Sequence, residues 1–187
     1  MLNREVIAQI LGIFAMAMNV LSYQQKKQKT VIAFQLVGGA LFAANFLMLG
    51  ATVGGILNLV GVFRAIVFMN KDKFHSDKLA WQVGFVTIYL VSYVLTFTLF
   101  GKEANPVNFI IEFLPVVGMT ATTISFRYKD AKMVRRFGLI SSPSWLIYNI
   151  ANGSVGAICC EVFSLISILI GIIRLDIKKN VVQKKIS

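Results

Sequence analysis

Apolar segments long enough to cross a membrane fill this chain, and its basic residues occupy every second gap between them. Sixteen of the nineteen Lys and Arg residues lie in four places: 24–30, 70–79, 127–136 and the tail from 174 onward. The other gaps and the N-terminus hold only Arg4 and Lys102, and Arg64 lies within an apolar segment. Because short loops rich in Lys and Arg stay on the cytoplasmic side, the alternation predicts seven spans with the N-terminus outside and the C-terminus inside.

The composition excludes an ordinary soluble domain, because 57% of the residues are hydrophobic and only 14% are charged. Crossing about 30 Å of hydrocarbon takes roughly 20 helical residues, so seven spans use nearly all of the 187 residues. The predicted spans are 6–23, 31–49, 52–70, 80–99, 107–126, 136–151 and 154–173. The net charge of +11 is spread over separate loops. It favours membrane lipids with anionic headgroups as partners, and no nucleic acid.

The sixth segment, 136–151, is the least apolar of the seven, since it contains Ser141, Ser142, Pro143, Ser144 and Asn149. Without it, the basic gap before it and the basic tail would lie on opposite sides of the membrane. Charge parity therefore predicts that this segment crosses. Its polar groups are then expected to face other helices or water, because lipid cannot satisfy them.

An offset of 103 residues aligns the first three spans with the last three. The coinciding residues include Ile7 with Ile110, Leu11 with Leu114, Met16 with Met119, Ser22 with Ser125, Phe34 with Phe137 and Leu36 with Leu139. We therefore expect an all-α membrane protein built as a parallel 3+1+3 repeat. Its expected parts are a first triple-helix bundle at 1–75, a linker transmembrane helix at 76–103, a second triple-helix bundle at 104–176 and a basic cytoplasmic tail at 177–187.

The second half of the chain contains several motifs: Leu114 to Gly118, Trp145 to Asn149, Gly153 to Gly156, Glu161 and Ile172 to Arg174. In the first half, Tyr23 and Gln24 ahead of KKQKT look like a degraded Pro-Gln signature. Together these motifs resemble those of the YgjV family of bacterial inner membrane proteins, which is distantly related to SWEET and PQ-loop transporters. The resemblance implies a multi-pass protein of the bacterial inner (plasma) membrane. It also implies the 3+1+3 fold and a transport role, without a substrate.

Glu161 is the most informative single residue, because a carboxylate inside an apolar span costs roughly 2.5 to 3.5 kcal/mol unless it is sheltered. At the 103 offset it coincides with Asn58, and each follows an aromatic residue by sixteen positions, Trp145 and Phe42 respectively. The resemblance implies that Phe42, Asn58, Trp145 and Glu161 line one substrate-binding cavity. A carboxylate where the sugar facilitators have an amide favours a cationic solute or proton coupling. The alternative is that Asn58 and Glu161 only tie helices together.

Three further residues within the spans carry predictions. Arg64 is expected to extend toward the lipid headgroups, with pairing to an acidic group as the alternative. Pro115 and Pro143 interrupt their helices, because proline removes a backbone hydrogen bond. The resemblance implies that both act as hinges for alternating access.

The leading functional hypothesis is a carrier or facilitator for a small polar or cationic solute. The alternative is a non-transporting membrane protein that retains a PQ-loop-like fold and serves interaction or structure. We expect no enzyme, no metal and no cofactor, because no nucleophile, base and orienter occur together and no metal-ligand spacing is present. Homo-oligomerisation remains open.

Overall fold

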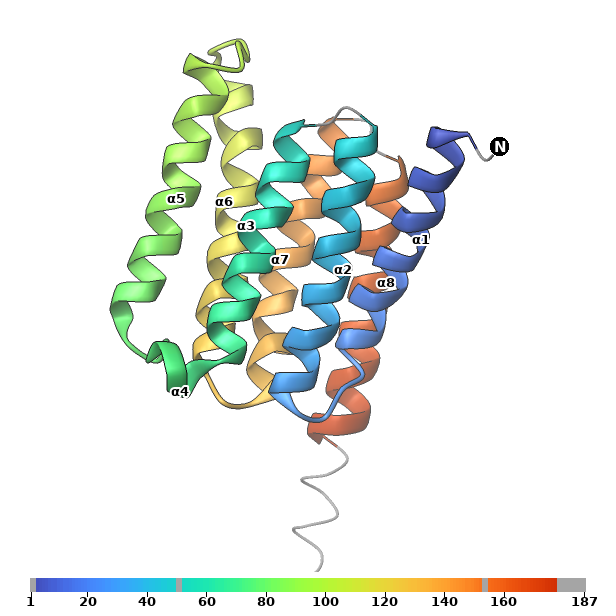
Figure 1. The fold of residues 1–187 in the computed structure, drawn as a ribbon, viewed down its shortest axis with the longest axis vertical. Coiled ribbons are helices and arrows are strands. Elements are labelled where there is room, and N and C mark those ends of the chain that lie inside the picture. The colour runs from blue at the N-terminus through green and yellow to red at the C-terminus, as the bar shows by residue number, and fades with distance from the viewer. Residues whose placement is uncertain (1–2, 50–51, 153–154, 178–187) are drawn as a thin grey trace, which may run out of the picture.

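The computed structural model describes residues 3–49, 52–152 and 155–177, and every regular element within these ranges is a helix (Figure 1). The elements are α1 (Arg4–Ser22), α2 (Gln28–Met48), α3 (Thr52–Met69), α4 (Lys71–Phe74), α5 (Leu79–Thr98), α6 (Pro106–Arg127), α7 (Ala131–Ala151), α8 (Val155–Gly171) and the π-helix η1 (Ile172–Ile177). The all-α class is therefore confirmed. Most of the predicted basic tail, 178–187, lies outside the described residues.

Each of the seven predicted segments corresponds to one long helix, although the boundaries differ. The helix predicted to begin at 31 begins at Gln28, and the one predicted to begin at 136 begins at Ala131. Among the described residues, five helical segments are long and apolar enough to cross a membrane: α1, α2, α5, α6 and Gly156–Ile177. The apolar part of α3, Gly55–Met69, is shorter. The chain thus has the helices of a multi-pass membrane protein.

Local sequence explains where two of these helices begin. Asn105 accepts a hydrogen bond from the backbone N–H of Asn108 at 2.9 Å, and Pro106 occupies the first helical position of α6. Asp130 accepts one from the backbone N–H of Lys132 at 2.9 Å and caps α7. Both caps satisfy donors that the first turn of a helix leaves unpaired.

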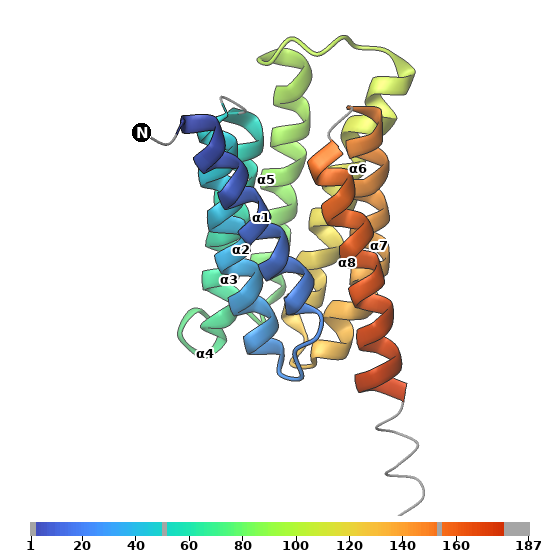
Figure 2. The ribbon, with the colours of Figure 1, turned by 90° about the vertical axis from the view of Figure 1, so that its right-hand side faces the viewer.

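The long helices form two neighbouring sets. On one side α2 packs against α1 and α3, and on the other α7 packs against α6 and α8 (Figure 2). The sets meet where α1 contacts α8, α2 contacts α7 and α3 contacts α6. Helix α5 packs along α6, and this arrangement leaves space between the two sets for a site.

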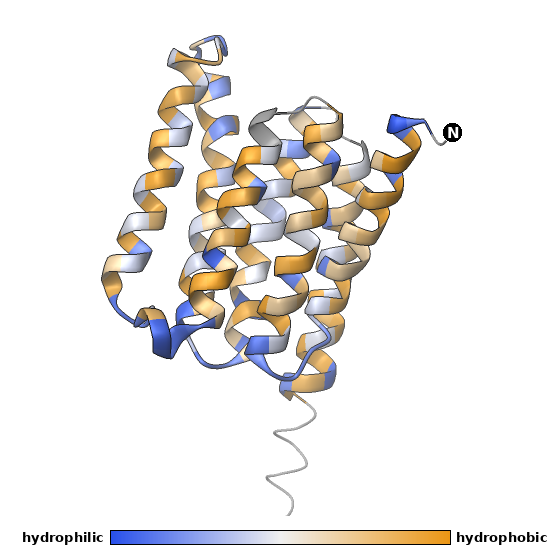
Figure 3. Cartoon of the chain, in the orientation of Figure 1, coloured by the Kyte–Doolittle hydropathy of each residue, from blue (hydrophilic) through white to orange (hydrophobic). Residues whose placement is uncertain are grey.

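Hydrophilic residues gather where α1 joins α2, at α4 and where α6 joins α7, while the helices between are mostly hydrophobic (Figure 3). We call this end of the molecule the basic end. Its loops carry Lys26, Lys27, Lys71, Lys73, Lys78 and Lys129. Several of the largest fully buried side chains lie on the helical turns that approach it, including Ile32, Phe68, Phe126 and Ile168. Large side chains are therefore packed together next to the basic end.

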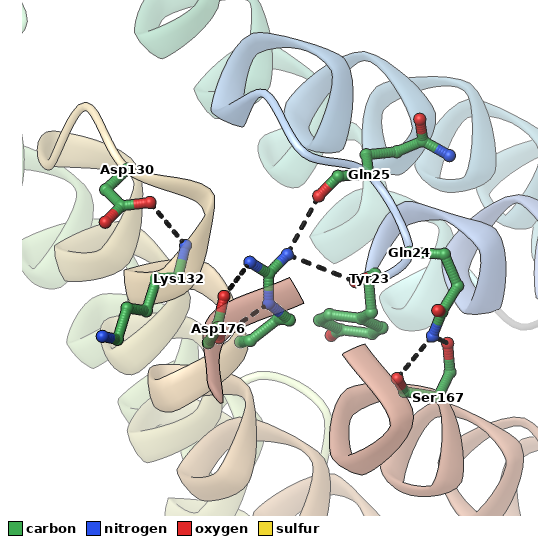
Figure 4. A network of polar contacts seen from close by, with 8 residues as sticks. Tyr23, Gln24, Gln25, Asp130, Lys132, Ser167 and Asp176 are labelled. Carbon is green, nitrogen blue, oxygen red and sulfur yellow. Dashed lines mark hydrogen bonds and ion pairs between the residues drawn. The ribbon is translucent and has the colours of Figure 1, made fainter. Parts of the chain in front are cut away.

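A network of polar contacts also joins the two sets of helices at the basic end (Figure 4). The Gln24 side-chain amide donates to the backbone oxygen of Ser167 at 2.6 Å and to its hydroxyl at 2.8 Å. The Gln28 amide donates to the backbone oxygen of Phe126 at 2.8 Å. Lys71 donates to the Gln28 side-chain oxygen at 3.1 Å and to the backbone oxygen of Arg127 at 3.0 Å.

The prediction of a basic gap at 127–136 was wrong over 131–135, because α7 begins at Ala131. Arg135 therefore lies on the helix, where it is only 2% exposed. Its guanidinium forms a bidentate salt bridge with Asp176 of η1, in which Nε lies 3.0 Å from one carboxylate oxygen. It also donates to the backbone oxygens of Gln25, at 2.9 Å, and Tyr23, at 3.4 Å. A residue counted as a loop charge is instead a buried link between α7, η1 and the loop after α1.

Candidate functional site

A cavity of about 200 Å³ lies between the two sets of helices. It is lined from α1, α2, α3, α6, α7 and α8, and its lining includes all four residues predicted to form the site: Phe42, Asn58, Trp145 and Glu161. The structure therefore brings these residues to one cavity, although they come from four different helices. Their role in binding a solute stays a prediction.

Aromatic rings stand on both sides of this cavity. Phe42 stacks on Phe46 within α2, with ring centroids 6.0 Å apart. Across the cavity, Trp145 meets Tyr148 edge-on at 5.8 Å. Trp145 also packs against Gly118 so closely that a Cβ there would lie 2.9 Å from the indole. The glycine thus leaves the space that Trp145 occupies, and a larger residue at 118 would displace the ring.

The polar residues of α7 face the protein interior, as predicted for the sixth segment. Ser141, Ser142, Ser144 and Asn149 are all buried, and all except Ser144 line the cavity. Ser141 exchanges a hydrogen bond with Thr122 of α6 at 3.1 Å. The low hydropathy of this helix is therefore the result of its polar face toward the cavity and its neighbouring helices.

Glu161 is the acidic group of the cavity. Its carboxyl group interacts with the side chain of Ser142, which also interacts with the hydroxyl of Tyr23. Within the described ranges the two salt bridges are Lys102 with Glu112 and Arg135 with Asp176, so Glu161 belongs to neither. A carboxyl group at such a place is available to a cation or a proton.

Arg64 is the functional candidate whose direction the sequence did not predict. It lines the same cavity, so the prediction that it extends to the headgroups was wrong. Its Nη1 donates to the Tyr89 hydroxyl at 3.2 Å, to the Met119 backbone oxygen at 3.2 Å and to the Thr123 hydroxyl at 3.4 Å. The guanidinium also lies over the ring of Phe126, 5.1 Å from its centroid. The only signal in the sequence was a basic residue inside an apolar segment.

A second cavity, of about 340 Å³, lies between α3, α5, α6 and α7. Lys102 lines it and forms a salt bridge of 2.9 Å with Glu112, besides a 3.5 Å hydrogen bond to the Asn152 side chain. Pro115, one of the two predicted hinges, borders this second cavity inside α6, and Pro143 lies inside α7. The hinge role of both prolines stays a prediction.

The chain matches the model of one protein family, and no solved structure matches it. Comparison with curated proteins and with solved structures found no match. The model of one protein family matches residues 6–179, nearly the whole chain, and describes bacterial inner membrane proteins. That location agrees with the several apolar helices of the fold. The chain therefore belongs to the Imp-YgjV family of bacterial inner membrane proteins.

Proposed function

We propose that the protein is a carrier for a small polar or cationic solute, which binds in the cavity between the two sets of helices. The observation that carries this proposal is the lining of that cavity. Two aromatic residues, an amide and a carboxyl group from four helices surround one space within a membrane protein. Aromatic faces hold sugars or cations, and a few polar groups fix their orientation.

The helix bounds support the proposed parallel repeat of three helices, a linker and three helices. Shifted by 103 residues, the first and last residues of α2 fall on those of α7. The same shift brings α3 onto α8 with the same first residue, and α1 onto α6 to within two residues at either end. We assign α5 as the linker and place the basic end in the cytoplasm, by the positive-inside rule.

In this proposal the basic end is the closed side of the carrier. Tyr23 and Phe126 line the cavity toward that end and are both buried. Beyond them lies the polar network of Gln24, Gln28 and Arg135. Release into the cytoplasm would require these contacts to part, with Pro115 and Pro143 as the bending points. The chemistry is binding and release, with no covalent step.

The test is transport and binding by the purified protein and its Glu161→Gln variant. A carrier should be stabilised against heat by at least one small solute in a screen of polar and cationic compounds. Glu161→Gln should weaken that stabilisation and change the pH dependence of uptake into proteoliposomes. Glu103→Gln serves as the matched control, because Glu103 is an exposed carboxylate outside the cavity.

Two results would contradict the proposal. Unchanged uptake at every pH by a folded Glu161→Gln variant would remove the role of this carboxyl group. A screen in which no solute stabilises the protein, together with copurification of another membrane protein, would favour the interaction or structural role. That alternative is motivated by Gly12 and Ala40, which stand where Pro115 and Pro143 occur in the second half.

A further inference from the structure

The central cavity contains one basic and one acidic side chain that are not paired with each other. Arg64 enters from α3 in the first set of helices, and Glu161 enters from α8 in the second. In the described part of the chain neither forms a salt bridge. Charges held away from bulk water are costly unless a partner compensates them. The cavity therefore offers a place for one negative and one positive group.

The hydrogen bonds of Arg64 divide its guanidinium into two parts. Nη1 makes all three bonds, to Tyr89, Met119 and Thr123, and these hold the group in position. Nε is inaccessible and has no hydrogen-bond partner, and in the described ranges Nη2 donates to none. Nη2 therefore keeps its N–H donors for an anionic group in the cavity, such as a carboxylate or phosphate.

Glu161 provides the opposite half of such a site. It lies on the other wall of the cavity, with Trp145 and Phe42 among the neighbouring lining residues. A carboxylate and aromatic faces together attract an ammonium group. Arg64 and Glu161 line the same cavity, so the two charged groups border one space.

We propose that the solute of this carrier is a small zwitterion, whose anionic group binds Arg64 and whose cationic group binds Glu161. The inference rests on the proposed carrier function and specifies the substrate class of the same cavity. A solute with a single charge would leave one wall uncompensated, and a neutral solute would leave both. A zwitterion compensates the two walls at once and adds no net charge to the membrane interior.

The size of the cavity limits the solute. A cavity of about 200 Å³ is smaller than the roughly 300 to 1,000 Å³ of pockets for drug-sized ligands, which favours a small solute. An amino acid with a short side chain, such as alanine, is a solute of this kind. Larger zwitterions would require the two sets of helices to separate further.

A series of four compounds of equal size tests the inference directly. Alanine is zwitterionic, alaninamide is a cation, lactate is an anion and lactamide is neutral. The wild-type protein is heated in detergent with each compound, and uptake of each into proteoliposomes is measured. We expect alanine to stabilise the protein and to be taken up in preference to the other three. Preference for alaninamide, lactate or lactamide would overturn the zwitterion inference and leave the carrier function standing.

Variants then test which group of the solute binds Arg64 and which binds Glu161. Arg64→Gln should remove the preference for alanine over alaninamide, and Glu161→Gln should remove the preference for alanine over lactate. Each should weaken alanine binding by about tenfold or more. Arg136→Gln is the matched control, because Arg136 is exposed on α7 outside the cavity. Unchanged alanine preference in folded Arg64→Gln or Glu161→Gln would contradict the assignment.

If Arg64→Gln does not fold, Arg64→Lys keeps the positive charge and should bind alanine more weakly, since an ammonium lacks the separate Nη1 and Nη2 groups that hold the arginine side chain and donate to the solute. The series on the wild-type protein needs no variant and decides the inference by itself. A complete absence of binding by all four compounds would count against both the zwitterion and the carrier.

Discussion

Two combinations of an arginine and a carboxyl group in this protein differ in whether the two groups are joined. At the basic end Arg135 and Asp176 are both nearly inaccessible to solvent and are joined by a bidentate salt bridge. In the central cavity Arg64 and Glu161 stand on different walls and form no salt bridge with each other. The chemical groups are the same, but the first set closes on itself and the second is left open to a third partner.

In the proposed carrier, this difference separates a structural role from a binding role. A buried pair that satisfies itself fixes the position of the elements it joins, here α7, η1 and the loop after α1. Two charged groups that are held apart around a cavity do not stabilise the folded state by attracting each other. Their electrostatic attraction becomes available only when a ligand enters.

The largest expected effect comes from breaking the closed pair. Arg135→Met leaves the Asp176 carboxylate buried without its partner, which should lower the free energy of unfolding by about 3 to 5 kcal/mol. The measurement is thermal or denaturant unfolding of the detergent-solubilised protein. Arg136→Met is the control, because Arg136 is exposed. The double variant Arg135→Met with Asp176→Leu should recover much of the loss, and equal stability of the two single arginine variants would disprove the structural role.

An intermediate effect should follow from filling the open site. Gly61 lines the cavity, and a Cβ at this position would meet no atom within 4 Å. Gly61→Leu should therefore place a side chain in the cavity and abolish stabilisation by solute and uptake, while the melting temperature of the free protein is kept. Gly84→Leu on the exposed side of α5 is the matched control, since a Cβ there also meets no atom within 4 Å. Uptake that persists in Gly61→Leu would show that the solute binds outside this cavity.

The smallest effect concerns Lys71 at the basic end. Partial burial, and next the charge of Lys129, lowers the pKa of Lys71 from 10.5 to about 8. Between these values the unfolded chain binds more protons than the folded protein, so this residue should make stability rise as the pH increases. Between pH 8 and pH 10.5, the melting temperature of the wild type should therefore rise slightly relative to that of Lys71→Gln. Parallel curves for the two proteins would contradict the shift.

The positions of the helices could be predicted from the sequence, because hydropathy and loop charge are read from residues that are close together in the chain. The prediction failed at the start of α7, where three basic residues suggested a loop. The reason is that Arg135 is satisfied by Asp176, which lies 41 residues away in the sequence and is brought near only by the fold. Local patterns contain no information about such a partner.

The candidate site, too, could be predicted only in part. Phe42, Asn58, Trp145 and Glu161 could be predicted to share a cavity because the resemblance to SWEET-like transporters implies it for the two pairs of positions that the 103-residue offset relates. Arg64 has no basic counterpart at that offset, where the residue is Ser167. Its direction depends on Tyr89 and Thr123, acceptors supplied by α5 and α6. The repeat predicted the common features of the two halves and could not predict where they differ.

The position of these acceptors in the chain has a consequence for biosynthesis. In the described ranges, the side chains that Arg64 contacts through a hydrogen bond or a ring, namely Tyr89, Thr123 and Phe126, are made after it. On the proposed topology, α3 therefore enters the bilayer with an arginine whose partners do not yet exist, at a cost of about 2.5 to 3.5 kcal/mol. The partners that offset this cost become available only when α5 and α6 have been made.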